Sequence, residues 1–380
     1  MIYFDYNSTA PVMREAREAW LAATEEITGN PSSMHGIGAR AAAALEKARE
    51  QLAGFLGCKS EDIVWTSGAT EANNTVMHHF SRALDARAEV WISGIEHPCV
   101  MESAQYYFGK RARMIPVTPE GVIDLEWLAS ELADRRPGLV SVMAANNETG
   151  VIQPWREVQA MCRGYEAPFF TDAVQWIGKL PADGLGQCDF VSGAAHKFGG
   201  PRGVGFLKIP HKKRVTPLLL GGEQERGARA GTQNVPAIVS MMAALEAREK
   251  QISDNQHILR GAWRDHFERD FLAAAPGAVM FGAKSPRLWN TVLALMPEGN
   301  NRRLWVMRLD QAGFAVSSGS ACTTGKEEPS HVLAAMGLPA AKAVRAVRIS
   351  GGWETTEADW QALAGALIKM HEPIQSQGVL

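Results

Sequence analysis

The sequence predicts an α/β protein with a mostly parallel central sheet flanked by helices, followed by a smaller α/β C-terminal domain. Short apolar runs alternate with helix-like segments from about residue 62 to residue 209, and a long helix-prone segment then leads into a second set of apolar runs. Buried runs separated by helices are typical of a parallel sheet covered on both faces. A chain of 380 residues is also long enough for one large and one smaller domain.

The candidate strands of the large sheet are short and apolar, as buried strands are. They are DIVWTS (62–67), EVWIS (89–93), LVSVMAA (139–145), PFFTDA (168–173), FVSGA (190–194) and GVGFLKI (203–209). Helices are expected between several of them, at 123–136 and 154–165. Ahead of the strands, a helix over 39–57 ends at Gly57 and has one apolar face, formed by Leu45, Ala48, Leu52 and Phe55.

The helix-prone segment from about Val235 to Ala275 connects the sheet to the smaller domain. That domain offers the strands NTVLALM (290–296) and AVRIS (346–350), and a last helix that opens with a capping box of Thr356 and Asp359. We therefore expect a large domain over residues 1–250, including the N-terminal segment, and a smaller C-terminal domain over residues 251–380.

Composition and charge exclude several classes of function. A formal net charge of -2 is no reason to expect nucleic acid or an anionic membrane as a partner, and no apolar run approaches membrane-spanning length. The first residues lack the basic and apolar regions of a signal peptide, so we expect a cytoplasmic protein. None of the five cysteines forms a C-x-x-C pair, which disfavours a disulfide framework or a metal site.

Small and polar residues follow the first three predicted strands, at the edge where ligands bind in such sheets. Residues 67–70 open a helix, and the free N–H groups of a helix start suit a phosphate, although most such turns are only turns. His97 could lie flat on a planar ligand or cap its strand. Asn146 and Asn147 could donate to a ring oxygen or serve as turn residues.

A carboxylate and a lysine follow the next two strands. Asp172, with Gln175 three residues later, ends a buried run, where a carboxylate needs a protonated ring nitrogen or a structural salt bridge. Lys197 ends the strand region before Gly199 and Gly200, and a partly desolvated lysine becomes a nucleophilic amine. The lysine, the aspartate and a phosphate cradle together indicate a pyridoxal phosphate site.

One cysteine stands apart from the others. Cys322 is the only thiol among the eight small residues of SSGSACTTG (317–325). A free cysteine is usually a small core hydrophobe, so this one is either a tolerated surface thiol or a nucleophile on a moving arm. The other four cysteines lie beside apolar or helix-forming neighbours, and we expect them to be inert.

Taken together, the motifs resemble those of the cysteine desulfurases, within the class V aminotransferase group of pyridoxal phosphate enzymes. The resemblance covers essentially the whole chain through YFDYNSTAP, GNPSSMH, TSGATEANN, IEHP, NNETG, TDAVQ, HKFGGPRGVGFL, GGEQERGARAGT, SSGSACTTGKEEPSHVLAAMG and VRISGG. It implies fold type I of these enzymes and a homodimer. It also implies removal of sulfur from L-cysteine, which leaves L-alanine and a persulfide on Cys322 for transfer to an acceptor protein, such as an iron–sulfur scaffold.

The resemblance implies roles for the residues at matching positions. Lys197 would hold pyridoxal 5′-phosphate and remove the substrate Cα proton, His97 would stack on the ring, and Asp172 would pair with the ring nitrogen. The remaining cofactor contacts would be Asn147 and Gln175 at the ring oxygen, Ala69, Thr70 and His196 at the phosphate, and Thr232 at the phosphate of the other subunit. Arg348, together with Asn147, would bind the substrate carboxylate, which suits the planar guanidinium fork. His97 is also our candidate base for the Cys322 thiol.

The chain departs from the family pattern at Ala194, where the family usually has a serine whose hydroxyl contacts the phosphate. Three alternatives stay open beside the desulfurase. A selenocysteine lyase or another class V enzyme would share most of these motifs, whereas a silent sulfur-transfer scaffold would not need both Lys197 and Cys322. An aldolase that uses only a lysine would leave Asp172 unexplained. The sequence does not identify the sulfur acceptor.

Overall fold

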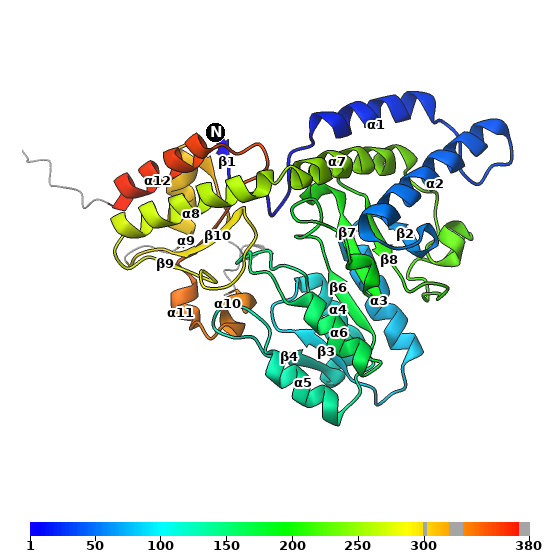
Figure 1. Cartoon of the computed structure of the whole chain (residues 1–380), viewed down its shortest axis with the longest axis horizontal. Coiled ribbons are helices and arrows are strands. Elements are labelled where there is room, and N and C mark those ends of the chain that lie inside the picture. The colour runs from blue at the N-terminus through cyan, green and yellow to red at the C-terminus, as the bar shows by residue number, and fades with distance from the viewer. Residues whose placement is uncertain (299–301, 319–329, 372–380) are drawn as a thin grey trace, which may run out of the picture.

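The computed structural model describes residues 1–298, 302–318 and 330–371 of the chain. Its elements form two layered parts, a larger one around a seven-stranded sheet and a smaller one around a three-stranded sheet (Figure 1). This arrangement confirms the predicted fold class, while the domain boundary at residue 250 stays a prediction. Within the described ranges, no helix combines the length and the apolar character needed to cross a membrane.

The large sheet runs in the order β2-β8-β7-β6-β5-β3-β4. In this order the strands span Ile63–Thr66, Gly205–Lys208, Phe190–Ala194, Phe169–Asp172, Leu139–Ser141, Val90–Ser93 and Ala112–Ile115. Strand β8 is antiparallel to both of its neighbours, and the other pairings are parallel. The other six strands therefore point in one direction, and their carboxyl ends meet at one edge of the sheet.

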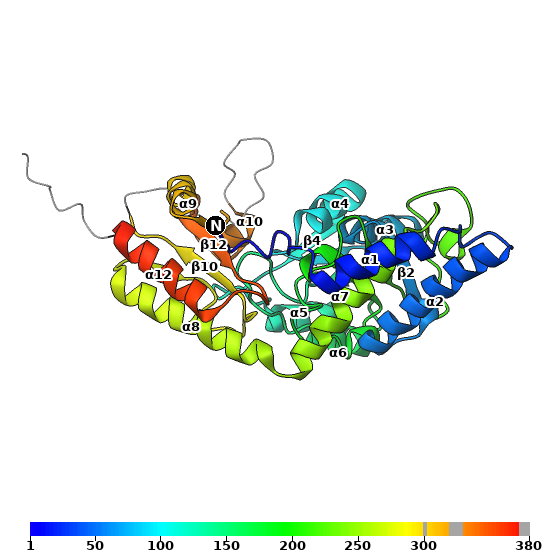
Figure 2. The ribbon, with the colours of Figure 1, turned by 90° about the horizontal axis from the view of Figure 1, so that it is seen from above.

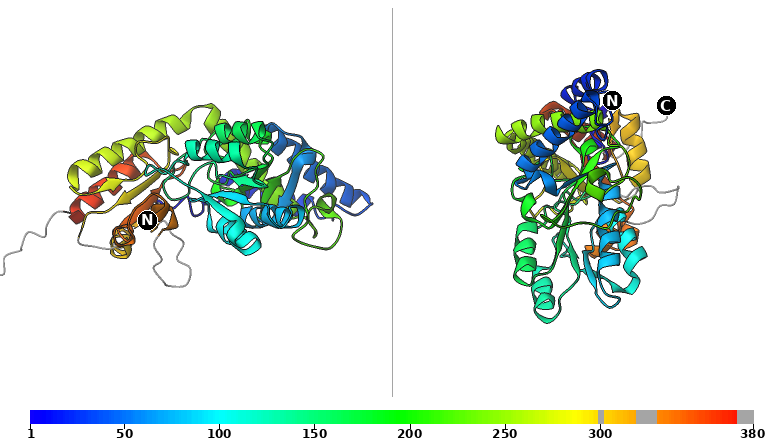
Figure 3. Two further views of the ribbon diagram at one scale, coloured as in Figure 1. Left: turned by 90° about the horizontal axis from the view of Figure 1, so that it is seen from below. Right: turned by 90° about the vertical axis from the view of Figure 1, so that its right-hand side faces the viewer.

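Helices cover both faces of this sheet, because each strand sends alternate side chains into two apolar cores. On β2, Ile63 and Trp65 join the core of one face and Val64 joins the core of the other. The first face carries α2 (Gly36–Leu56), α5 (Leu125–Asp134), α6 (Trp155–Gly164) and α7 (Val235–Ser253), and the second carries α3 (Ala69–Ala83) and α4 (Pro98–Phe108). The right-hand view of Figure 3 shows helices on both sides of the strands.

The smaller sheet is antiparallel and runs in the order β12-β10-β9. Its strands span Ala346–Ser350, Thr291–Leu295 and Val279–Met280. Helices α8 (Gln256–Ala274) and α12 (Glu357–His371) pack on one face, as Figure 2 shows. The short helices α10 (His331–Ala335) and α11 (Ala340–Ala343) cover the other face, and α9 (Arg302–Gln311) leads into β11 (Phe314–Ala315).

The N-terminal segment links the two parts. Strand β1 (Ile2–Tyr3) pairs in parallel with β11 in the smaller part, whereas α1 (Arg14–Glu26) lies along α7 of the larger part (Figure 1). The Ser240 hydroxyl of α7 donates to the Ala16 carbonyl of α1 at 2.6 Å. Residues 5–9, which we call the N-terminal strap, therefore cross from one part to the other.

Most of the predicted elements are found at their expected places. All six predicted strands of the large sheet are present, α2 ends at Gly57 in the left-handed conformation (φ 74°), and Leu45, Ala48 and Leu52 are buried. The capping box is also confirmed, because Thr356 Oγ1 accepts the Asp359 N–H at 3.2 Å and Asp359 Oδ2 accepts the Thr356 N–H at 2.8 Å.

The structure adds two details to these predictions. Strand β4 was missed because it is an edge strand with only one fully buried residue, so its sequence has no continuous apolar run. The helix-prone segment over 235–275 is formed by two helices, α7 and α8. Asn255 adopts a left-handed conformation (φ 57°) between α7 and α8, and this conformation ends one helix and redirects the chain into the next.

Candidate active site

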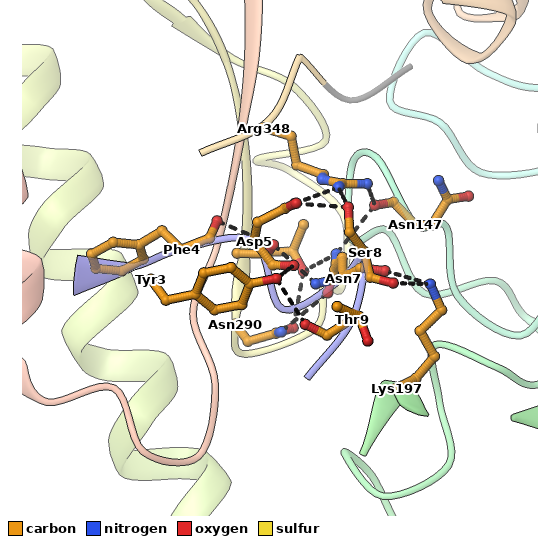
Figure 4. Close-up of polar contacts among 12 residues, drawn as sticks. Tyr3, Phe4, Asp5, Asn7, Ser8, Thr9, Asn147, Lys197, Asn290 and Arg348 are labelled. Atoms are coloured by element: carbon orange, nitrogen blue, oxygen red, sulfur yellow. Dashed lines mark hydrogen bonds and ion pairs between the residues drawn. The ribbon is translucent and has the colours of Figure 1, made fainter. Parts of the chain in front are cut away.

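The N-terminal strap meets the strand ends through Asn7, which is 1% exposed (Figure 4). Its backbone carbonyl accepts from Lys197 Nζ at 2.8 Å and from Gln175 Nε2 at 3.0 Å. Its side-chain oxygen accepts from Lys179 Nζ at 2.8 Å, and its Nδ2 donates to the Asn147 carbonyl at 3.1 Å. One strap residue therefore contacts three predicted site residues from three different loops of the large sheet.

Lys197 lies just beyond the end of β7, in a short 3₁₀ turn. Its amine donates to the carbonyls of Asn7 and Ser8, both at 2.8 Å. Burial, followed by the nearby charge of Arg348, lowers the pKa of Lys197 to about 8. Among the described residues, no carboxylate lies within ion-pair distance of this amine. An appreciable fraction of the amine is therefore neutral near physiological pH, as a nucleophile or base requires.

A second lysine in the site, Lys179, was missed by the sequence reasoning. It is 3% exposed, and its Nζ donates to Gln175 Oε1 at 2.5 Å as well as to Asn7. Burial, with the charges of Lys197 and Arg348, holds the pKa of Lys179 well below its usual range. Because Lys179 takes the amide oxygen of Gln175, the amide NH₂ is turned toward the strap. A lysine inside the apolar run WIGKL was the available signal.

Asp172 ends β6 and is 4% exposed. Its Oδ2 accepts from Asn73 Nδ2 at 2.7 Å and its Oδ1 accepts from the Val174 N–H at 3.0 Å. Each carboxylate oxygen therefore has one neutral donor and a remaining lone pair. No Lys or Arg in the described parts of the chain forms a salt bridge with Asp172, so a protonated ring nitrogen would be a suitable partner for it.

His97 caps α4, and the cap determines which ring nitrogen carries the proton. Its Nδ1 accepts the Cys99 N–H at 3.2 Å and lies 3.0 Å from the Cys99 thiol sulfur. Burial lowers the pKa of His97, so the ring is neutral with its proton on Nε2. In this state His97 can donate a proton from Nε2. To act as a base for Cys322, the ring would have to accept a proton on Nδ1, which would break the hydrogen bond from the Cys99 N–H.

The start of α3 offers free N–H groups beside Ala194. Within the helix, the first backbone donor is the Ala72 N–H, which bonds to the Gly68 carbonyl at 3.2 Å, so the earlier N–H groups of Ala69 and Thr70 have no partner in the helix. Gly205, which pairs with Ala194 across β7 and β8, has no room for a Cβ because one would lie 2.8 Å from Gly68 Cα. The backbone of Gly68 therefore lies directly against the start of β8, on the residue that pairs with Ala194 at the end of β7.

His196 also lies at this end of β7, and its Nδ1 is 3.2 Å from the Thr9 hydroxyl of the strap. Burial, followed by the charge of Lys197, lowers the pKa of His196 to about 4. The ring is therefore neutral at physiological pH and can offer one N–H donor to an anion.

Arg348 lies in β12 of the smaller sheet and is 4% exposed. Its Nη2 donates to Asp5 Oδ1 at 2.7 Å and to the Ser8 hydroxyl at 2.6 Å, and its Nη1 donates to the Asn147 carbonyl at 3.1 Å (Figure 4). The predicted carboxylate-binding arginine thus lies beside Lys197, but it already holds a carboxylate of the same chain.

Two predicted site residues are not part of this cluster. Thr232 is exposed in the loop before α7, and its predicted contact is to another subunit. Cys322 lies outside the described residues. Burial raises the pKa of Cys58 to about 11 and of Cys99, Cys162 and Cys188 to about 12, so these four thiols do not ionise at neutral pH.

The cluster fits pyridoxal 5′-phosphate. Lys197 supplies an amine of lowered pKa, and Asp172 supplies a buried carboxylate that has no cationic partner among the described residues. The start of α3 supplies N–H groups for a phosphate. No group of three metal-binding side chains occurs in the described ranges. The residues that sequence reasoning missed are Asp5, Asn7, Ser8 and Lys179, although the quoted motif YFDYNSTAP contained the first three.

Comparison with known proteins agrees with this geometry. A family model described as aminotransferase class-V matches residues 2–363. A cysteine desulfurase of Sinorhizobium fredii is 40% identical over 354 residues, which cover 92% of this chain and 91% of that protein. Cysteine desulfurase IscS of Dictyoglomus turgidum is 36% identical, with 99% and 95% covered. The structure of a NifS-like protein from Rickettsia africae matches with a TM-score of 0.88 and 32% identity, covering 98% of this chain and 100% of that chain. The chain belongs to the class-V aminotransferase family, in the branch of the cysteine desulfurases.

Proposed function

We propose that this protein is a pyridoxal phosphate-dependent cysteine desulfurase. It takes the sulfur of L-cysteine, releases L-alanine and carries the sulfur as a persulfide on Cys322. The observation that supports this most strongly is the proximity of Lys197, Asp172 and Arg348 at one edge of the large sheet, where the charges of Arg348 and Asp172 both act on the Lys197 amine. An amine, a ring partner and a carboxylate fork are the groups that an amino-acid substrate and this cofactor require.

Each of these residues has a distinct task in the proposal. When bound, the cofactor draws electrons from the substrate Cα, which weakens the Cβ–Sγ bond. Lys197 holds the cofactor and then takes the Cα proton, which its pKa of about 8 allows. Asp172 holds the ring nitrogen, and Arg348 orients the substrate through its carboxylate.

The surrounding residues position these groups. The Gln175 NH₂, turned by Lys179, and Asn147 serve the ring oxygen, while His97 covers the ring. Ala69, Thr70 and His196 receive the phosphate. At Ala194 the chain lacks a hydroxyl that the family pattern provides, and the free N–H groups at the start of α3 supply the remaining donors.

The proposal extends to partners. A homodimer would bring Thr232 of one subunit to the phosphate of the other, which accounts for the exposure of Thr232 in this chain. The persulfide would pass to a sulfur-acceptor protein such as an iron–sulfur scaffold, in the cytoplasm. Size-exclusion chromatography with light scattering tests the dimer, and Thr232→Ala should weaken cofactor retention only if the dimer forms.

The central test follows the sulfur atom. The protein loaded with cofactor is incubated with L-cysteine, L-alanine is quantified, and persulfides are alkylated and located by peptide mass spectrometry. We expect the label on Cys322. Cys322→Ala should bind L-cysteine but show no label at residue 322, and Cys58→Ala, the matched control, should behave as the parent. A label that persists on another cysteine in Cys322→Ala contradicts the proposal, and preferential release of selenide from L-selenocysteine would favour a selenocysteine lyase.

A further inference from the structure

The guanidinium of Arg348 is already bound by its own chain. Both N–H groups of Nη2 are used, one by Asp5 Oδ1 at 2.7 Å and one by Ser8 Oγ at 2.6 Å, and one N–H of Nη1 is used by the Asn147 carbonyl at 3.1 Å. The buried Nε–H has no hydrogen-bond partner within the described parts of the chain. The guanidinium therefore retains donors, but they are not adjacent to each other.

A substrate carboxylate needs two adjacent donors. It can bind a guanidinium in two bidentate ways, across Nη1 and Nη2 or across Nε and Nη2, and both ways use Nη2. Because Nη2 is fully engaged by Asp5 and Ser8, a second carboxylate cannot form a bidentate pair with Arg348 unless one of them leaves. The Nε–H of Arg348, which has no partner among the described residues, is available as the second donor of the Nε and Nη2 pair.

The structure indicates which group can leave. Arg348 is fixed in β12, where its backbone pairs with Leu293 on one side and with Ser317 on the other, and its side chain is 4% exposed. The Asp5 side chain is 23% exposed. The Asp5 backbone is held separately, because its carbonyl accepts from the Tyr3 hydroxyl at 3.1 Å. Rotation of the Asp5 side chain toward solvent therefore breaks its bond to Nη2 and the bond that it accepts from the Ser8 hydroxyl at 2.9 Å. It frees one N–H of Nη2 and leaves the strap backbone in place.

We propose that Asp5 is an internal competitor for the substrate carboxylate, which occupies Arg348 until L-cysteine displaces it and so sets the affinity of the site for its substrate. This inference rests on the proposed function, in which Arg348 receives that carboxylate. The Asp5–Arg348 ion pair also balances the positive charge of Arg348 while no substrate is bound. In the absence of substrate, the Asp5 charge balances Arg348 beside the two lysines, and the substrate carboxylate takes over this task when it binds.

Asp5→Asn tests the inference, because the amide keeps the size of the side chain and removes its charge. In the holoenzyme we expect KM for L-cysteine to fall about three- to tenfold, since a partly exposed ion pair no longer competes with the substrate. Isothermal titration with L-alanine, which requires no turnover, should show a dissociation constant lowered by a similar factor. Asp5→Glu, which restores the charge, should return both values toward those of the parent.

Asp265→Asn is the matched control, because Asp265 also pairs with an arginine, Arg264, but lies on α8 outside the site. It should leave both constants unchanged. If Asp5→Asn does not fold, Ser8→Ala removes the other Nη2 partner and should lower the same constants by a smaller factor. The opposite result overturns the inference: a raised KM and weaker L-alanine binding in Asp5→Asn would show that Asp5 positions Arg348 for the substrate. Failure of the proposed function is distinguishable, because the parent protein would then release no L-alanine from L-cysteine.

Discussion

The two lysines of the site, Lys197 and Lys179, have similar partners and different consequences. Both donate to Asn7, and burial lowers the pKa of both. Lys197 reaches backbone carbonyls at the rim of the large sheet and is only partly buried, whereas Lys179 is fully enclosed and bound to the side-chain oxygens of Asn7 and Gln175. A lowered pKa alone therefore does not identify the catalytic amine, because access to a substrate is also required.

The different surroundings of Lys197 and Lys179 suit the two amines to different tasks. Lys197 lies where a cofactor can replace its carbonyl contacts, while Lys179 lies beneath Trp289, whose indole N–H donates to the Lys179 carbonyl at 2.9 Å. Lys179 fixes the orientation of the Gln175 amide and of the Asn7 side chain. We therefore infer that one lysine takes part in the chemistry and the other positions residues around it.

The largest expected effect is that of Lys197→Ala. Under the proposed function, removing the amine removes both the covalent link to the cofactor and the base for the Cα proton. Turnover of L-cysteine should therefore fall by more than about a thousandfold. Circular dichroism should show a folded protein. Substantial turnover in this variant would mean that Lys179 can replace Lys197 and that the two amines do not have different tasks.

The lowered pKa of Lys197 also makes the stability of the protein depend on pH. In the unfolded chain a lysine titrates near 10.5, and in the folded chain Lys197 titrates near 8. Between these values the unfolded state binds a proton that the folded state does not bind, so the cofactor-free protein should gain up to roughly 3 kcal/mol as pH rises from 8 to 10.5. Urea unfolding of the parent and of Lys197→Met isolates this contribution, and parallel pH profiles of the two would refute it.

Lys179→Met tests the positioning role. The change leaves Gln175 Oε1 without a donor from residue 179, so the free energy of unfolding should fall by about 2 kcal/mol and turnover by about tenfold. Lys208→Met is the matched control, because Lys208 is similarly buried (4% exposed) and donates to the Cys188 carbonyl. Lys208 lies at the end of β8 that pairs with Val191, whereas the site lies at the end that pairs with Ala194. The control should lose stability but retain turnover. Equal losses of turnover in both variants would mean that Lys179 acts only through stability.

The smallest expected effect is that of Ala194→Ser, which restores the hydroxyl of the family pattern. In a Lys197→Ala background, where the cofactor is not held covalently, the serine should slow release of pyridoxal phosphate by up to about tenfold. Ala195→Ser is the control, because the Ala195 side chain lies against Gly200. A release rate that is unchanged or faster in Ala194→Ser would place the phosphate elsewhere or show that other donors already compensate.

Local sequence determined a large part of the fold and of the site. The alternation of apolar runs and helices predicted the large sheet, and the capping box of Thr356 and Asp359 predicted the start of the last helix, because both depend on residues close in sequence. Asp172 and Lys197 were also recognisable, since polar residues directly after buried strands are unusual and parallel strands end at one edge.

Only the tertiary structure decided how these residues are partnered. Asp5 and Arg348 are 343 positions apart, and Lys179 and Asn7 are 172 apart, so no local pattern could pair them. The edge strand β4 and the helix break at Asn255 were hidden for a related reason, since each depends on where the chain lies in the fold rather than on its own periodicity. The sequence by itself thus determined which groups can perform the chemistry, and the packing of a strap from one end of the chain against a strand from the other determined which of them are engaged before a substrate arrives.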